Sequence, residues 1–440
     1  MSIRTHIIKS TMLLSSLFII GQIAEATTVD VGGSIRPRVE YVNQGGQGLA
    51  TDGTNMTHTT MQTRLNVKAT VDENVSAFIQ IQDVRTWGGE VNSGLPPSLT
   101  RTGTSTSGNV DFHQAYFIVK DALGTGLNLK VGRQEMVFDE ARLIGNIGWI
   151  QQAQSFDAVR VDTRRDNVSF TGFYSQTWAS DTHPTLQSTT VATSAKPAGP
   201  ESSFVGGRAT YHMSGKDRIT GYIYSAFDPI IGTGTTPLLQ ELHTAGLYAA
   251  KTFGGVRLRF DGAFQFGEVT DTQEVDAYMI TFSAGKNLDI AHGARIEFWA
   301  DVLSGDDGTD ATKQTKFTIP YGTNHKFYGH ADKFLNNPTQ GLVDLAIKFW
   351  VKPTAKIKLV AHAHNFRADT LNPTAGINSE KMGSEIDLQA HYALAKNTKV
   401  VLGYSHFSAA AANTATSGGG VGGNPTFDTD WAFAMMISKF

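Results

Sequence analysis

Stretches in which apolar and polar residues strictly alternate recur along this chain and limit what it can fold into. In residues 254–269 (GGVRLRFDGAFQFGEV), Val256, Leu258, Phe260 and Phe264 hold alternate positions, and arginine, aspartate and glutamine stand between them. Because successive side chains of a β-strand point to opposite faces, such a strand has one apolar and one polar face. A half-buried strand of a soluble protein shows the same pattern, so recurrence and cellular destination must decide between the two.

The alternation returns in segments spread over the rest of the chain. It is clear in residues 60–71, 293–303, 354–366 and 384–394, where one face carries several charged side chains and the other is apolar. Strands this charged on one face do not fit the closed core of a sandwich. They fit a sheet whose apolar face meets lipid and whose polar face meets water.

Eighteen candidate strands can be placed along the chain, and sixteen remains an open alternative. They lie near residues 30–42, 58–71, 75–86, 109–120, 126–136, 154–164, 167–178, 203–213, 217–227, 241–253, 255–268, 275–286, 293–303, 341–352, 355–366, 382–393, 398–408 and 429–440. Short polar turns alternate with long connections, which is typical of outer-membrane barrels, and a sheet in lipid must close on itself. We predict an all-β fold, a transmembrane antiparallel β-barrel with both ends on the periplasmic side.

The two ends of the chain are consistent with export to the outer membrane. Arg4 and Lys9 precede an apolar run and an Ala24-Glu25-Ala26 site, the order found in a secretory signal peptide. The apolar run is shorter than the roughly 20 residues that a membrane-spanning helix needs, which disfavours an anchor. The last strand ends in Phe440, as in other outer-membrane barrels. We predict a cleaved signal peptide, residues 1–26, and one barrel domain, residues 27–440, in the bacterial outer membrane.

Composition adds two weaker constraints. The chain has no cysteine, which suits passage through an oxidising periplasm. Its formal net charge is -3, and this balance indicates no nucleic-acid partner.

Three stretches resemble a known family. They are VDFHQAYF (residues 110–117), the block of residues 129–162 with its GRQ, RLIG, W and FDAVR elements in order, and residues 302–334. Together they resemble the alginate-export family of outer-membrane porins, and the resemblance covers nearly the whole mature chain. It implies an 18-stranded barrel whose lumen carries an anionic polysaccharide outward.

If the apolar faces meet lipid, the alternating polar residues line the lumen. The pore-lining candidates are Arg36, Arg38, Arg64, Lys68, Arg133, Arg160, Arg208, Arg257, Arg259, Asp261, Arg295, Glu297, Lys356 and Lys358. Basic residues outnumber acidic ones in this set, and a basic lining raises the local concentration of anions. Arginine also matches carboxylate geometry with two hydrogen bonds at a time.

A structural role competes with solute attraction at some of these positions. Arg295 with Glu297, and Arg259 with Asp261, could equally form cross-strand ion pairs. For the pairs Arg36/Arg38 and Lys356/Lys358, which have few acidic residues nearby in sequence, attraction of solute is favoured.

Arg133 is a special case among the pore-lining candidates. Strict alternation groups it with Leu129 and Val131, on the lipid side, unless a β-bulge intervenes.

No metal or cofactor site is predicted. The acidic segment 304–310 lacks the ligand spacing of a calcium loop, and His325 and His330 have no accompanying cysteine or Glu-x-x-His pattern. His362 and His364 are expected only to line water. The side chains of one long connection are candidates to fold inward and narrow the pore: His325, Lys326, Tyr328, His330 and Asp332.

The leading hypothesis is a channel for anionic solutes, and export of a uronate polysaccharide is its sharpest version. The expected partners are outer-membrane lipid, the anionic solute or polysaccharide and, for export, a periplasmic secretion scaffold. A general or uptake porin for other small organic anions is the alternative. A barrel enzyme is the distant alternative, and adjacent Ser405 and His406 would point to opposite faces, a poor catalytic pair.

Overall fold

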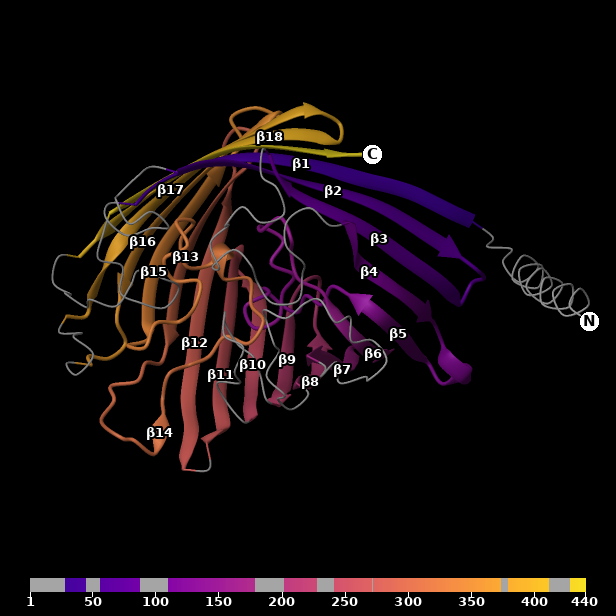
Figure 1. Cartoon of the computed structure of the whole chain (residues 1–440), viewed down its shortest axis with the longest axis horizontal. Helices are drawn as coiled ribbons and strands as arrows, with labels where there is room; N and C mark the ends of the chain where they lie inside the picture. The colour runs from indigo at the N-terminus through magenta and orange to yellow at the C-terminus, as the bar shows by residue number, and fades with distance from the viewer. Residues whose placement is uncertain are drawn as a thin grey trace, which may run out of the picture.

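The computed structural model describes most of the chain as one closed antiparallel β-barrel (Figure 1). The described residues are 28–44, 56–87, 110–178, 202–227, 241–270, 272–372, 379–410 and 428–440. The predicted signal peptide, residues 1–26, lies outside them. So do the predicted long connections 87–108, 179–202 and 409–428, apart from their end residues.

Eighteen strands form the wall of the barrel. They are β1 (Thr28–Gln44), β2 (Met56–Thr70), β3 (Val75–Thr86), β4 (Val110–Val119), β5 (Leu127–Gln134), β6 (Phe156–Arg165), β7 (Val168–Trp178), β8 (Ser202–His212), β9 (Arg218–Phe227), β10 (Glu241–Phe253), β11 (Val256–Thr270), β12 (Gln273–Leu288), β13 (Ala294–Leu303), β15 (Leu342–Val351), β16 (Ile357–Arg367), β17 (Lys381–Ala395), β18 (Thr398–Ala409) and β19 (Thr429–Lys439). Three short elements accompany them: the two-residue strand β14 (Lys313–Gln314) and the 3-10 helices η2 (Ala122–Gly124) and η3 (Asn324–Lys326).

The ring closes because β1 pairs with both β2 and β19, and each other wall strand pairs with its neighbours in the chain. Ser34, for example, lies opposite Arg64 on β2 and opposite Lys439 on β19. The prediction of eighteen strands is confirmed, and every predicted boundary agrees within two residues. Alternation locates these strands well because its period of two persists along each of them.

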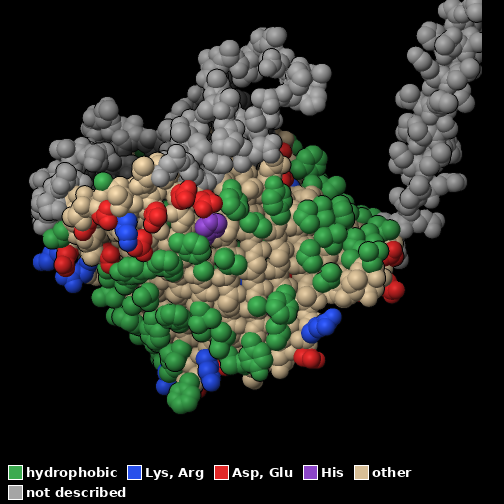
Figure 2. Space-filling view, turned by 90° about the horizontal axis from the view of Figure 1, so that it is seen from below, with side chains coloured by type: hydrophobic (Ala, Val, Ile, Leu, Met, Phe, Trp, Pro, Cys, Tyr) green, Lys and Arg blue, Asp and Glu red, His purple; other side chains and the backbone are tan. Residues whose placement is uncertain are grey.

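The outer face of the barrel is apolar, as the alternation predicts. Figure 2 shows hydrophobic side chains across this face, with most of its charged side chains toward the margins. Phe264, Ile280 and Leu402 belong to it, each about half exposed. Exposed tyrosines lie toward both ends of the strands, among them Tyr174 on β7 and Tyr211 on β8. Aromatic residues at these levels are a feature of membrane barrels, where they meet the lipid headgroups.

Two connections turn into the barrel. We call residues 135–155, between β5 and β6, the first inward segment, and residues 304–341, between β13 and β15, the second inward segment. They occupy the interior of the ring in Figure 1, the first in magenta and the second in orange. Their apolar side chains are buried there, as Met136, Ile144 and Phe317 illustrate.

The two inward segments pair with each other. Ile144 and Tyr321 form a parallel β-bridge, and the Gly145 N–H donates to the Tyr321 carbonyl at 2.9 Å. Gly145 is required at this contact, because a Cβ there would collide with Thr323 Oγ1 and with Ala141. Within the described residues, no helix is both long and apolar enough to cross a membrane.

Candidate functional site: the lumen and its inward segments

The wall formed by β1–β3 holds the first inward segment through guanidinium groups. Arg36 donates to Gln151 Oε1 at 2.8 Å and to the carbonyls of Gly148 and Ile150 at 2.7 and 2.8 Å. Arg38 donates to the Trp149 carbonyl at 2.8 Å, and its guanidinium carbon lies 4.3 Å from the centroid of that indole ring. The cations therefore bind backbone oxygens that would otherwise be buried without a partner.

Further donors on β2 and β3 extend this contact. Gln62 donates to the Gln151 carbonyl, and Gln82 donates to the Gln152 carbonyl at 2.8 Å. Alternation carries these amides inward with the arginines, so a polar row faces the segment along both strands.

Glu135 ties the start of the first inward segment to the wall. Its carboxylate lies 2.8 Å from His113 Nε2, accepts a hydrogen bond from Asn146, and has Arg64 Nη1 at 3.6 Å. Burial alone would raise its pKa, but these donors hold the pKa of Glu135 below its ordinary value. The group is therefore a carboxylate at neutral pH.

The middle of the first inward segment carries a buried ion pair. Arg142 Nη1 donates to Asp301 Oδ2 on β13 at 2.8 Å, and the side chains are 5% and 1% exposed. The Arg142 guanidinium also stacks 4.0 Å from the Phe327 ring centroid in the second inward segment. Breaking one half of such a pair leaves an uncompensated buried charge, which makes Arg142 the strongest single anchor of the segment.

Two acidic residues of the same segment attach it to the opposite strands. Asp139, with left-handed backbone geometry (φ 50), accepts a hydrogen bond from Arg208 at 2.9 Å. Glu140 lies 3.7 Å from Arg259 Nη1 and 3.3 Å from Lys326 Nζ. Burial would raise the pKa of Glu140, but Lys326 and Arg259 together hold it below its ordinary value.

The wall formed by β13–β17 is acidic where it meets the second inward segment. Glu385 accepts a hydrogen bond from the Ala331 N–H at 2.8 Å, and Asp387 accepts one from the His330 N–H at 3.3 Å. Lys348 on β15 completes the contact by donating to the carbonyls of Lys326 and Phe327, both at 3.2 Å. The segment is thus held through its backbone, as the first one is.

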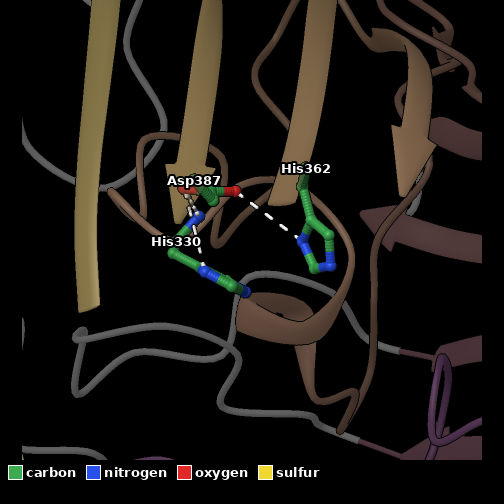
Figure 3. A group of neighbouring side chains, drawn as sticks. All are labelled: His330, His362 and Asp387. Atoms are coloured by element: carbon green, nitrogen blue, oxygen red, sulfur yellow. Dashed lines mark hydrogen bonds and ion pairs between the residues drawn. The ribbon is translucent and has the colours of Figure 1, made fainter. Parts of the chain in front are cut away.

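Histidines gather at this acidic wall. His330 of the second inward segment lies beside His362 on β16 and Asp387 on β17, and Figure 3 shows the three side chains converging. One ligand atom from each lies within 4.8 Å of the others. His364, two residues along β16, has Nδ1 2.8 Å from Asp344 Oδ2 and Nε2 3.8 Å from Asp387 Oδ2.

Most pore-lining candidates do lie on the inner face of the barrel. They are Arg36, Arg38, Arg64, Lys68, Arg160, Arg208, Arg257, Arg259, Asp261, Arg295, Glu297 and Lys358. These residues occupy the same alternate positions of their strands as the buried residues, whereas most exposed residues stand at the positions between them. Lys356 instead lies in the short turn before β16. The inward folding expected of residues 325–332 is also found, since His325, Tyr328 and His330 are buried.

Arg133 does not line the lumen. Its neighbour Gln134 is fully buried and faces inward, whereas Arg133 faces outward and forms a two-bond ion pair with Asp157 of β6, at 2.8 and 2.9 Å. The register shift that could have turned it inward falls between Gln80 and Ile81, where β3 meets β4, while β5 pairs with β6 without a shift.

Of the two ion pairs considered from the sequence, Arg295 with Glu297 is found, along β13, and Arg259 with Asp261 is not. Arg259 and Arg295 both bind Glu297, Arg259 at 2.6 Å, so Glu297 joins two cations. Asp261 does not pair with Arg259; it accepts a hydrogen bond from the Tyr222 hydroxyl at 2.6 Å. Much of the positive charge of the wall is therefore neutralised locally.

The anchors within the first inward segment are not among the residues predicted from the sequence. Asp139, Glu140 and Arg142 lie in the block of residues 129–162 that carries the family resemblance, but this stretch has no alternation. Only the clustering of charges in an otherwise apolar connection could have indicated them.

A closed 18-strand barrel with an apolar outer face and two connections folded into its lumen defines a porin-type channel of the outer membrane. The solved structures agree on the fold. The chain resembles Pseudomonas aeruginosa OccK2 (OpdF) at 12% identity with a TM-score of 0.57, over 94% of this chain and 98% of that chain. It resembles a BenF-like porin from Pseudomonas fluorescens Pf-5 at 13% identity with a TM-score of 0.55, over 93% and 99%.

The family model described as alginate export matches residues 27–419. The chain therefore belongs to the alginate export family and is a channel protein of the bacterial outer membrane. A search of curated protein sequences gave no significant match.

Proposed function

We propose that this channel passes anionic solutes, and that an acidic uronate polysaccharide leaving the cell is its most specific cargo. The observation that carries the proposal is the charge of the inner face next to the short turns. Basic residues there include Lys68, Lys130, Arg160, Arg257, Arg295, Lys358 and Lys399. The acidic residues are fewer: Asp30, Asp162 and Glu297 on the same stretches of strand, and Asp217 in the turn before β9, which pairs with Arg257.

This end of the barrel is the periplasmic one in outer-membrane barrels, because short turns face the periplasm there. Thr28 of β1 and Lys439 of β19 lie at the same end. A cationic opening between low-dielectric walls concentrates anions from the adjoining solution. An exported acidic polymer would meet this opening first, and a periplasmic scaffold would dock against the same face.

The inward segments favour a second candidate, a porin for small organic anions. They narrow the lumen beyond the cationic opening, and their anchors Arg36, Arg142 and Glu140 hold them firmly to the wall. A single small anion passes such a lumen more readily than a polymer does. The two candidates share the chemistry of the opening and differ in the size of what passes.

The adjacent Ser405 and His406 point to opposite faces, as the sequence predicts. Ser405 points inward and donates to Asp387 Oδ1 at 2.5 Å, while His406 points outward and contacts Asp430 at 2.8 Å. We infer that these two residues are not a nucleophile and its base, since the histidine cannot reach the hydroxyl of Ser405.

Planar-bilayer recording with a salt gradient tests the proposal. We expect a reversal potential that shows preference for anions, and a shift toward cations when Lys130→Glu and Lys358→Glu are combined. The control combines Lys251→Glu and Lys286→Glu, an equal charge change on outward-facing residues of β10 and β12 near the same end. A cation-selective wild-type pore, or equal shifts in both variants, would overturn the proposal.

Uronate oligomers of increasing length separate the two candidates. A polysaccharide channel should be blocked more tightly by longer oligomers added from the short-turn side. If the monomer permeates and block does not tighten with length, the small-anion candidate holds instead.

A further inference from the structure

The cluster of His330, His362, His364 and Asp387 contains polar atoms without partners in a buried place. Asp387 and His364 are 1% and 0% exposed in their side chains. Among the described residues, His362 Nδ1, His364 Nε2 and Asp387 Oδ2 have no hydrogen-bond partner. Buried polar atoms are rarely left so, and both nitrogens lie close to the same oxygen, Asp387 Oδ2, at 3.9 and 3.8 Å.

The second ring nitrogen of His364 faces the same carboxylate oxygen. Its Nδ1 lies 2.8 Å from the Asp344 carboxylate, and its Nε2 lies 3.8 Å from Asp387 Oδ2 without a hydrogen bond. An imidazole nitrogen and a carboxylate oxygen are both common ligands of metal ions, so a cation is the kind of ligand that the two atoms can share.

The hydrogen bonds of Asp387 also leave one of its carboxylate oxygens, Oδ2, without a donor. Its Oδ1 accepts hydrogen bonds from the Ser405 hydroxyl at 2.5 Å and from the His330 N–H at 3.3 Å. Oδ2 lies 3.9 Å from His362 Nδ1. Outer partners that orient a carboxylate and a histidine in this way are typical of metal centres, where they fix the ligand atoms.

We propose that His330, His362 and Asp387, with His364 as a fourth donor, bind one divalent transition-metal ion of the Zn²⁺ type. Imidazole and carboxylate ligands suit zinc, whereas Mg²⁺ and Ca²⁺ require mainly oxygen ligands. In a tetrahedral zinc site with bonds of about 2.1 Å, ligand atoms lie about 3.4 Å apart. Here His330 Nδ1 lies 3.8 Å from Asp387 Oδ1, His362 Nδ1 lies 3.9 Å from Asp387 Oδ2, and the ligand atoms of the three residues lie within 4.8 Å of one another. The three residues therefore need to draw together by up to about 1.4 Å around the ion.

The ion has a structural consequence for the lumen. His330 belongs to the second inward segment, whereas the other three ligands belong to the wall strands β16 and β17. A bound ion therefore ties the segment to the wall. Lys348, which lies opposite His362 in the strand register, donates its ammonium group to the carbonyls of Lys326 and Phe327.

Metal binding is tested on the purified full chain in detergent, after removal of metal, by titration with Co²⁺ and displacement with Zn²⁺. We expect one equivalent of Co²⁺ with the intense visible absorption of a four-coordinate site. His362→Ala and Asp387→Asn should each lower the affinity by more than about 100-fold, because outer partners alone are worth about 10–100-fold. The control His58→Ala removes a lumenal histidine on β2, beside Glu40 of β1, and should leave binding unchanged.

Folding of each variant is checked by its heat-dependent migration in gels. If a variant does not fold, the titration of the wild type still tests the proposal, because it does not depend on any variant. Absence of stoichiometric Co²⁺ and Zn²⁺ binding to the wild type would overturn it, as would equal affinity in His362→Ala. Because binding is measured without solute, its outcome is independent of whether the channel carries anions.

Discussion

Two walls of the barrel hold the two inward segments with different sets of side chains. The wall of β1–β3 offers donors: Arg36 and Arg38 bind backbone carbonyls of the first inward segment. The wall of β13–β17 offers acceptors as well as a donor: Glu385 and Asp387 bind backbone N–H groups of the second, and Lys348 binds two of its carbonyls. Each wall thus satisfies backbone groups that irregular segments cannot satisfy themselves. The charged side chains on the inner face of this barrel therefore hold the inward segments in place, whether or not they also attract a solute.

The largest expected effect is on the buried ion pair that anchors the first inward segment. Arg142→Ala leaves the Asp301 carboxylate buried and unpaired, which we expect to cost about 3–5 kcal/mol. Denaturant unfolding measures the loss of stability. Single-channel conductance should rise if the first inward segment no longer narrows the lumen. The combined variant Arg142→Met with Asp301→Leu should recover most of the stability, since an apolar pair of similar volume is tolerated. Equal stability of Arg142→Ala and the wild type would contradict the anchoring role.

The contact between the wall of β1–β3 and the first inward segment should depend on the guanidinium groups of that wall more than on a neighbouring charge. Single-channel currents should show the difference. Arg36→Gln removes hydrogen bonds to two carbonyls, each worth about 1.5–3 kcal/mol when the donor is charged. We expect larger and noisier single-channel currents as residues 148–151 loosen. Lys68→Gln, on the inner face of β2, is the matched control and should alter selectivity without adding noise. Quiet currents in Arg36→Gln would show that the contact does not hold the segment.

Acid should loosen the first inward segment. Glu135 and Glu140 have pKa values below their ordinary range, so their stabilisation is complete above the unfolded-state pKa of about 4.3 and is lost as pH falls through the lower folded-state values. Conductance should therefore rise as the pH is lowered below about 4. Glu135→Gln combined with Glu140→Gln should show the raised conductance already at pH 7. A pH response unchanged in this double variant would assign the effect to other carboxylates.

The smallest effect is expected outside the lumen. Arg133→Ala breaks a partly exposed ion pair with Asp157, and exposed pairs are worth about 0–1 kcal/mol. Ion selectivity should be unchanged. A clear shift of the reversal potential would place Arg133 in the lumen after all.

The wall could be predicted from the sequence, and the contents of the lumen only in part. Alternation persists over each strand, so it locates β11 and also the direction in which Arg257 and Arg259 point. The partners of these residues depend on connections without periodicity. Nothing near Arg36 in sequence indicates that its guanidinium binds residues 148–151, because the contact joins positions more than a hundred residues apart.

The metal cluster shows the same limit. The sequence shows His362 and His364 on one face of a strand, and His330 in a distant connection. Cross-strand register then brings Asp387 opposite His362, and the fold of the second inward segment brings His330 to them. Metal-ligand spacing along the chain is therefore a poor guide in a barrel, where strand pairing sets which residues meet.

The central claim is that two connections fold into the lumen and meet there. It is tested most directly by a disulfide in a chain that has no cysteine of its own. Ile144→Cys and Tyr321→Cys replace the two residues of the bridge between the segments, and bridged positions come within the Cα range of about 4.4–6.8 Å that a disulfide needs. The account predicts that mild oxidation of the folded protein in detergent closes this bond and leaves no free thiol. Two thiols that both remain free to react with a maleimide under these conditions would contradict it.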